Sequence, residues 1–96
     1  MKLRILPSAL ADLAVGRHFY SRQDQAAGDY FFDSLFADID SLLMDAGAHR
    51  KIFGDHRHLA KRFPYAISYK VEGDTAIIWR VLDCRQNPAK NRQALQ

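Results

Sequence analysis

Cysteine and long apolar runs are almost absent from this chain of 96 residues. The single cysteine, Cys84, excludes an internal disulfide, so a reducing cytoplasm is the expected compartment. The start of the chain, Met1 to Pro7, has too short an apolar run for a signal peptide or a membrane span. Repeats and low-complexity segments are also missing. The composition, 48% hydrophobic and 26% charged, is that of a soluble globular protein, and the length fits one domain, residues 1–96, with one core.

Acidic residues are scarce in the second half of the chain. Residues 1–48 hold four cations and seven acids, a net charge of −3, whereas residues 49–96 hold ten cations and four acids, a net charge of +6. A basic half beside an acidic half suggests an anionic partner for the basic half. The alternative is that these charges only keep the protein in solution.

The first half of the chain predicts a strand and two helices. Lys2 to Leu6 alternates polar and apolar residues before Pro7, which predicts a short strand. Ser8 is the expected N-cap of a helix from Ala9 to about Gln23. The residues that could line one face of this helix are Leu10, Leu13, Ala14 and Tyr20.

A second helix is expected to start at Asp29, after a tight turn formed by residues 25–28. Its apolar residues recur with the period of a helix that buries one stripe: Phe32, Leu35, Phe36, Ile39, Leu42 and Leu43. Four acids fall off this stripe and are expected to face water: Asp33, Asp38, Asp40 and Asp45. Gly47 is the expected end of the helix.

After Gly47 the period changes to two, which is typical of strands. Residues 51–53 and 56–63 are predicted to be extended around a turn or bulge at Gly54-Asp55. Tyr65 to Val71 and Thr75 to Leu82 are predicted to form a hairpin around Gly73-Asp74. One alternation of the last strand turns Ile77, Trp79 and Val81 toward the helices and turns Ile78, Arg80 and Leu82 away, with Lys70. The predicted fold is α+β, in the order βααβββ, with a helical hairpin packed on one face of a small, mainly antiparallel sheet.

In this order the elements resemble the RelE/ParE toxin superfamily. The resemblance rests on Phe63-Pro64-Tyr65 at the start of a strand, on Gly73-Asp74 in the hairpin, and on Val81-Leu82 before the ending Arg85-Gln86-Asn87-Pro88. It covers Leu3 to about Pro88, and its first and last motifs are more similar to the ParE-like branch. It implies the toxin of a type II toxin–antitoxin pair, neutralised by a small, partly disordered, ParD-like antitoxin in a hetero-oligomer. ParE-like members are associated with inhibition of DNA gyrase, and the resemblance implies neither a cofactor nor a membrane.

RelE-like members instead cleave mRNA at the ribosome. That chemistry needs cations at the phosphate and a group that moves protons, for which His56 or His58 could serve. In RelE-type enzymes an Arg follows the Tyr that opens the strand, and a Tyr lies in the tail. Here Ala66 follows Tyr65, and residues 84–96 contain no Tyr. We therefore expect a gyrase-inhibiting binding protein without catalytic residues. There are two alternatives: an mRNA interferase, and a degenerate member that binds only its antitoxin. Direct binding of the protein to nucleic acid is left open.

A basic surface is the expected target-binding site, because cations and aromatic residues suit a large protein or protein–DNA partner. The candidates are Arg57, Lys61, Arg62, Lys70, Arg80 and Arg85. Each could instead be a solvated surface charge. Arg80 lies inside the most apolar strand, where it is costly unless paired, so an ion pair with Asp83 or a helix acid is its alternative role.

The remaining candidates for chemistry are weak. His49, His56 and His58 have no thiolate partner and no clear third ligand, so no metal site is predicted. Cys84 has no organised base beside it and is expected to be a small, half-buried residue rather than a nucleophile.

Overall fold

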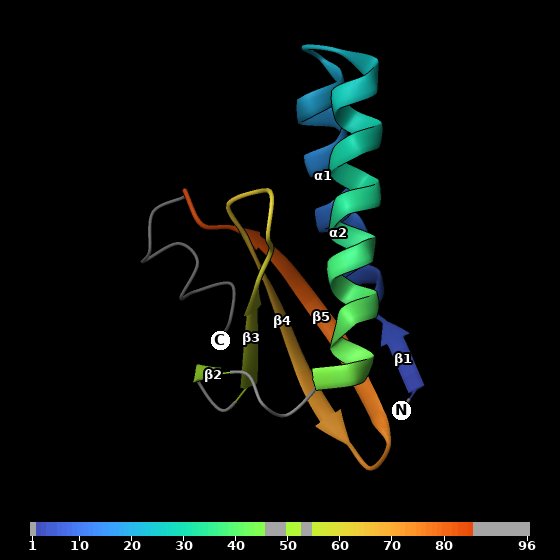
Figure 1. Cartoon of the computed structure of the whole chain (residues 1–96), viewed down its shortest axis with the longest axis vertical. Coiled ribbons are helices and arrows are strands. Elements are labelled where there is room, and N and C mark those ends of the chain that lie inside the picture. The colour runs from blue at the N-terminus through green and yellow to red at the C-terminus, as the bar shows by residue number, and fades with distance from the viewer. Residues whose placement is uncertain (1, 46–49, 53–54, 86–96) are drawn as a thin grey trace.

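The computed structural model describes residues 2–45, 50–52 and 55–85, which form two helices and five strands (Figure 1). In chain order they are β1 (Lys2–Ile5), α1 (Pro7–Ser21), α2 (Gln25–Asp45), β2 (Arg50–Ile52), β3 (Asp55–Leu59), β4 (Tyr65–Glu72) and β5 (Thr75–Asp83). The sheet has the order β1-β5-β4-β3-β2, and β1 is parallel to β5 whereas all other pairs are antiparallel. The predicted α+β fold, a helical hairpin on one face of a mainly antiparallel sheet, is confirmed, with β2 as a short additional strand.

The start of α1 differs from the prediction. Pro7 occupies the first turn, where its fixed φ and missing N–H are tolerated, and Leu6 is the N-cap without a side-chain bond. Ser8 does not cap the helix, because its hydroxyl donates to the carbonyl of Trp79 in β5. The predicted buried face of α1 is confirmed for Leu13, which is fully buried, and for Tyr20, which packs partly buried against the core. It is wrong for Leu10 and Ala14, which are exposed, and Ala9 and Gly16 are buried instead.

The turn between the helices lies earlier than predicted. Residues 25–28 belong to the first turns of α2, and the chain turns at residues 22–24 instead. The carboxylate of Asp24 accepts a hydrogen bond of 3.1 Å from the N–H of Ala26, and its carbonyl accepts bonds from Ala27 and Gly28. Asp24 therefore starts the helix, because it satisfies N–H groups that lack partners in the first turn.

The buried stripe of α2 confirms Leu35, Ile39 and Leu42 and adds Phe31, all of which are fully buried. Phe32 and Phe36 lie only partly buried beside the core. Asp33 and Asp40 are exposed as predicted, but Asp38 is 2% exposed and accepts a bond of 3.1 Å from the N–H of Lys61. Asp38 is buried rather than exposed because its carboxylate accepts a hydrogen bond from a backbone N–H of the loop between β3 and β4. The expectations for Leu43, Asp45 and Gly47 fall on side chains or residues outside those described.

The extended segment predicted at 56–63 ends early, because β3 stops at Leu59 and residues 61–64 form bends before β4. Pro64 lies in these bends, where its missing N–H breaks no ladder bond. The segment at 51–53 is confirmed for its part in β2, whereas Phe53 and Gly54 lie outside the described residues.

The side-chain alternation of β5 changes at a bulge. Ser68 pairs with Arg80, but the next residue of β4, Tyr69, pairs with Ile78, so Trp79 is the extra residue. Ala76, Ile78 and Val81 therefore all lie in the helix-covered core. The alternation that placed Ile77 and Trp79 toward the helices is wrong, because a strict period of two cannot represent the bulge.

The core lies between the helical hairpin and the sheet, with Tyr69 and Ile67 of β4 at its centre. Gly16 allows α1 to approach the other helix closely, since a Cβ atom at this position would lie 2.5 Å from Cζ of Phe31. The opposite face of the sheet is not covered by either helix. We call it the open face.

Candidate functional site

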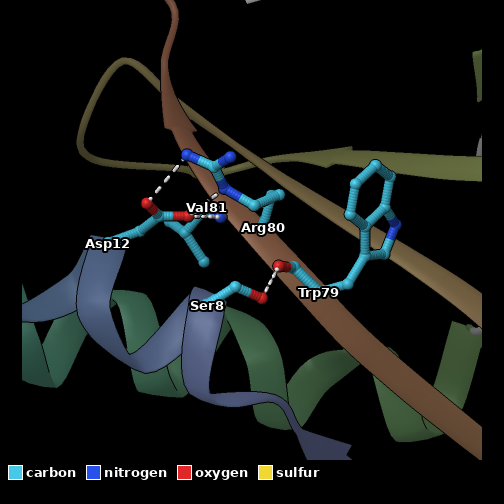
Figure 2. Close-up of polar contacts among 5 residues, drawn as sticks. All are labelled: Ser8, Asp12, Trp79, Arg80 and Val81. Atoms are coloured by element: carbon cyan, nitrogen blue, oxygen red, sulfur yellow. Dashed lines mark hydrogen bonds and ion pairs between the residues drawn. The ribbon is translucent and has the colours of Figure 1, made fainter. Parts of the chain in front are cut away.

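The free edge of β5 is completed by α1. The β1 strand pairs with β5 only as far as Ile78, and beyond this point α1 lies beside the strand (Figures 1 and 2). The hydroxyl of Ser8 donates to the carbonyl of Trp79 at 2.6 Å, and Asp12, one helical turn later, accepts from the N–H of Val81 at 2.9 Å. Two α1 side chains thus replace a neighbouring strand, so that these backbone groups of β5 keep hydrogen-bond partners.

Arg80 is held by the same carboxylate. Its Nε lies 2.8 Å from Oδ2 of Asp12 and its Nη2 lies 3.1 Å from Oδ1, a two-pronged ion pair that Figure 2 shows. The side chain of Arg80 is 27% exposed and that of Asp12 is 17% exposed. The expected helix acid is therefore Asp12, a residue that the sequence analysis missed, although its spacing of four from Ser8 on one helix was a usable signal. The geometry gives Arg80 a structural role, and its role as a target contact stays a prediction.

Arg85 forms a second ion pair at the end of β5. Its Nε and Nη2 lie 3.0 and 2.8 Å from the two carboxylate oxygens of Asp83, and Nη2 also donates to the hydroxyl of Tyr20. Hydrogen bonds from Arg85 lower the pKa of Asp83. Burial, with repulsion from Asp83 and Tyr20, raises the pKa of Tyr65 to about 12. Arg85 is half exposed, but its charge is largely compensated by Asp83.

Lys61 and Arg62 lie in the loop between β3 and β4, away from the open face. Both side chains are exposed, and the N–H of Lys61 is bound by Asp38. Aromatic side chains of both helices surround the neighbouring Phe63, whose ring centroid lies 5.0 to 5.6 Å from those of Tyr20, Tyr30 and Phe31. These two candidates therefore form a small basic group at one end of the sheet, apart from Arg57 and Lys70.

Arg57 and Lys70 lie on the open face. Arg57 pairs with Ser68, and Lys70 pairs with Ile77, which lies on the face opposite Ile78 and the core. Arg57 donates to Sγ of Cys84 at 3.4 Å, and Nζ of Lys70 lies 5.9 Å from the ring centroid of Trp79. Neither has an ion-pair partner among the side chains that the structure describes.

Arg4 of β1 joins this surface, because it pairs with Ile77 beside Lys70. Arg4 is not among the predicted target-binding residues, although its alternation with the apolar Leu3 and Ile5 indicates the face away from the core. The side chains of Arg4 and Lys70 are exposed, and Arg57 is half-buried. Arg4, Arg57 and Lys70 are therefore cations of the open face that have no ion-pair partner among the described side chains.

The two histidines of β3 point the other way. His56 pairs with Tyr69 and stacks on its ring at 5.1 Å between centroids, and His58 pairs with Ile67. Tyr69 and Ile67 belong to the helix-covered core. The side chains that could move protons are thus separated from the unpaired cations by the sheet itself.

Two further results concern metals and membranes. Within residues 2–45, 50–52 and 55–85, no group of three His, Cys, Asp or Glu side chains could hold a metal ion. Neither described helix is long and apolar enough to cross a membrane. Cys84 is half-buried, as the sequence predicts.

The sequence comparison with protein families identifies one class of protein, the toxins of type II toxin–antitoxin systems. Residues 3–88 match the family described as "ParE toxin of type II toxin-antitoxin system, parDE". The chain belongs to this family and is the toxin component of such a system. A chain in the structure titled "Chromosomal ParDE TA system from P. aeruginosa" is similar, with a TM-score of 0.75 and 21% identity over 84% of this chain and 92% of that chain. At this identity the similarity shows the fold. No curated protein matches the sequence.

Proposed function

We propose that this toxin inhibits DNA gyrase and is neutralised by a cognate, ParD-like antitoxin. Membership in the ParE toxin family supports the proposal, and the arrangement of the sheet favours it over RNA cleavage. General acid–base catalysis requires a proton carrier within hydrogen-bond reach of the reacting atoms. His56 and His58 lie on the face opposite Arg57 and Lys70, so the cations and the histidines cannot act on one phosphate together.

The position after Tyr65 also contributes no charge. Ala66 is 3% exposed and pairs with Leu59 on one side and Leu82 on the other, so an apolar row crosses the open face there. This is the position at which the nuclease pattern has an arginine. The toxin therefore acts by binding, in the cytoplasm where gyrase and DNA are found.

A paired assay tests the target. The purified toxin is added to a gyrase supercoiling reaction and, in parallel, to translating ribosomes with a labelled mRNA. We expect inhibition of supercoiling and intact mRNA. Cleaved mRNA without an effect on gyrase would replace this proposal with the mRNA interferase. No effect in either assay, together with tight antitoxin binding, would identify a degenerate member.

The outer face of α1 is the proposed contact for the antitoxin. Ala11, Val15 and Phe19 follow each other at intervals of four and are exposed, with Val15 70% and Phe19 43% exposed. A disordered antitoxin segment that folds onto this stripe would bury apolar surface that the toxin alone leaves in water.

Val15→Asp tests this contact. We expect at least a tenfold loss of antitoxin affinity in calorimetry, because a carboxylate would be buried against apolar surface. Ala14→Asp, which adds the same charge on an exposed position of the same helix, is the matched control. Equal affinities for both variants would place the antitoxin elsewhere, for example at an edge of the sheet.

A further inference from the structure

The open face carries an excess of positive charge that no described group neutralises. Among the described side chains, its cations are Lys2 and Arg4 of β1, Arg57 of β3 and Lys70 of β4, and its acid is Glu72 of β4. Glu72 and Lys2 both lie beside Thr75, at the end of the sheet next to the turn between β4 and β5. Two cations are left out of the set: Lys2 because it shares its end of the sheet with Glu72, and Arg80 because Asp12 neutralises it. The other three, Arg4, Arg57 and Lys70, have no ion-pair partner among the described side chains.

The register sets the spacing of these three cations. Arg4 and Lys70 lie on either side of Ile77, so their Cα atoms are separated by two strand spacings, about 10 Å. Arg57 lies one strand away from Lys70 and one side-chain repeat along it, a diagonal of about 8 Å. The cations therefore form a triangle wide enough to meet several charges of a regular polyanion rather than a single small anion.

We propose that this triangle binds the phosphate backbone of duplex DNA directly, without gyrase. Duplex DNA carries one charge per roughly 1.7 Å of its axis, so a patch of this width faces several phosphates at once. The inference deepens the proposed gyrase inhibition, on which its biological role rests. A toxin that holds DNA through its sheet would act on gyrase that is already bound to DNA.

The surroundings of the triangle favour duplex DNA over an acidic protein. Protein interfaces have an apolar, aromatic centre, whereas DNA-binding surfaces are more polar and more positive. The exposed large apolar side chains of the described residues lie on the helices, apart from Leu59 at the end of β3. No such side chain lies within the triangle itself.

The same surroundings favour a duplex over a single strand. Proteins bind single strands mainly by stacking exposed aromatic rings on bases. Trp79 is the aromatic residue that the described strands place on the open face, and it is only partly exposed, with Lys70 near its ring. The triangle thus offers charge for the backbone but little stacking surface for bases.

Salt dependence of binding tests the proposal. Each phosphate contact contributes a slope of about 0.9 in a plot of log affinity against log salt, so three contacts predict about a 40-fold loss of affinity between 50 and 200 mM salt. Binding of the full chain to a labelled 30-bp duplex is followed by fluorescence anisotropy. Lys70→Gln and Arg4→Gln should each reduce this loss to about 12-fold, because one contact is removed. Arg22→Gln removes one exposed cation from the turn between the helices and should behave as the wild type.

Three results would overturn the inference. The first is no binding of the wild-type toxin to the duplex at 50 mM salt. The second is the same salt dependence in Lys70→Gln as in Arg22→Gln, and the third is tighter binding to single-stranded RNA of the same sequence than to the duplex. The gyrase assay keeps the two proposals separate. Supercoiling inhibited equally by the wild type and by variants that bind no DNA would refute a role of the DNA contact in gyrase inhibition and leave gyrase inhibition standing.

Discussion

Replacement of Asp12 tests whether α1 completes the edge of β5. Asp12→Ala leaves the N–H of Val81 without its acceptor, which costs about 1 to 3 kcal/mol. It also removes the partner of Arg80, and the partial exposure of this pair limits that contribution to about 1 kcal/mol. We therefore expect a loss of about 2 to 4 kcal/mol, a large part of the stability of a domain of this size.

Chemical denaturation and thermal melting measure this loss. A change of this size should lower the melting temperature by about 10 to 20 °C. Asp12→Asn keeps an oxygen for the N–H of Val81 but loses the charge, so it should cost only about 1 kcal/mol. Asp40→Ala removes an exposed acid of α2 and should change stability by less than about 0.5 kcal/mol.

The test compares the losses of stability in Asp12→Ala and Asp12→Asn. If Asp12→Ala costs no more than Asp12→Asn, the bond to Val81 does not support the strand and the reasoning about the edge is wrong. A double-mutant cycle with Arg80→Met isolates the ion pair, since the coupling energy measures the interaction between Asp12 and Arg80 alone. Loss of toxicity in Arg80→Met in proportion to its loss of stability would assign Arg80 to the fold rather than to the target surface.

Two further predictions follow from the core. Gly16→Ala should destabilise the protein by about 1 to 3 kcal/mol in urea denaturation, because the added Cβ meets the ring of Phe31, and an unchanged midpoint would show that the helices can separate without cost. The raised pKa of Tyr65 favours its protonated form in the folded state, so its contribution to stability is present below pH 10 and is lost as the pH rises toward 12. Tyr65→Phe should flatten this decline in denaturation curves measured across that range, and an equally steep decline in Tyr65→Phe would assign it to other groups.

Much of the fold could be predicted from residues that repeat with a clear period. Leu35, Ile39 and Leu42 mark the buried stripe of α2 by spacing alone, because a helix with one buried face requires that spacing. The first and last residues of the helices were harder to predict than their buried faces. Helix α2 begins at Gln25, four residues before the predicted start, since Gly28 within residues 25–28 indicates a turn by composition but is tolerated within a helix.

The candidate site could be predicted only as a set of cations. Six basic residues were selected by type and position, but the sequence does not show which of them have acid partners. Arg80 and Arg85 are compensated by Asp12 and Asp83, whereas Arg57 and Lys70 are not. Asp12 lies 68 residues before Arg80 in the chain, and no local pattern connects the two.

The sequence alone determined the fold class, the family resemblance and the basic character of the second half, because periodicity, turn residues and net charge are local or additive properties. The tertiary structure decided which charges remain free and which face they occupy. The bulge at Trp79 reverses the alternation of β5, and the pairing of β1 with β5 brings Arg4 beside Lys70. These relations depend on strand register and on contacts between distant segments, which a single sequence does not specify.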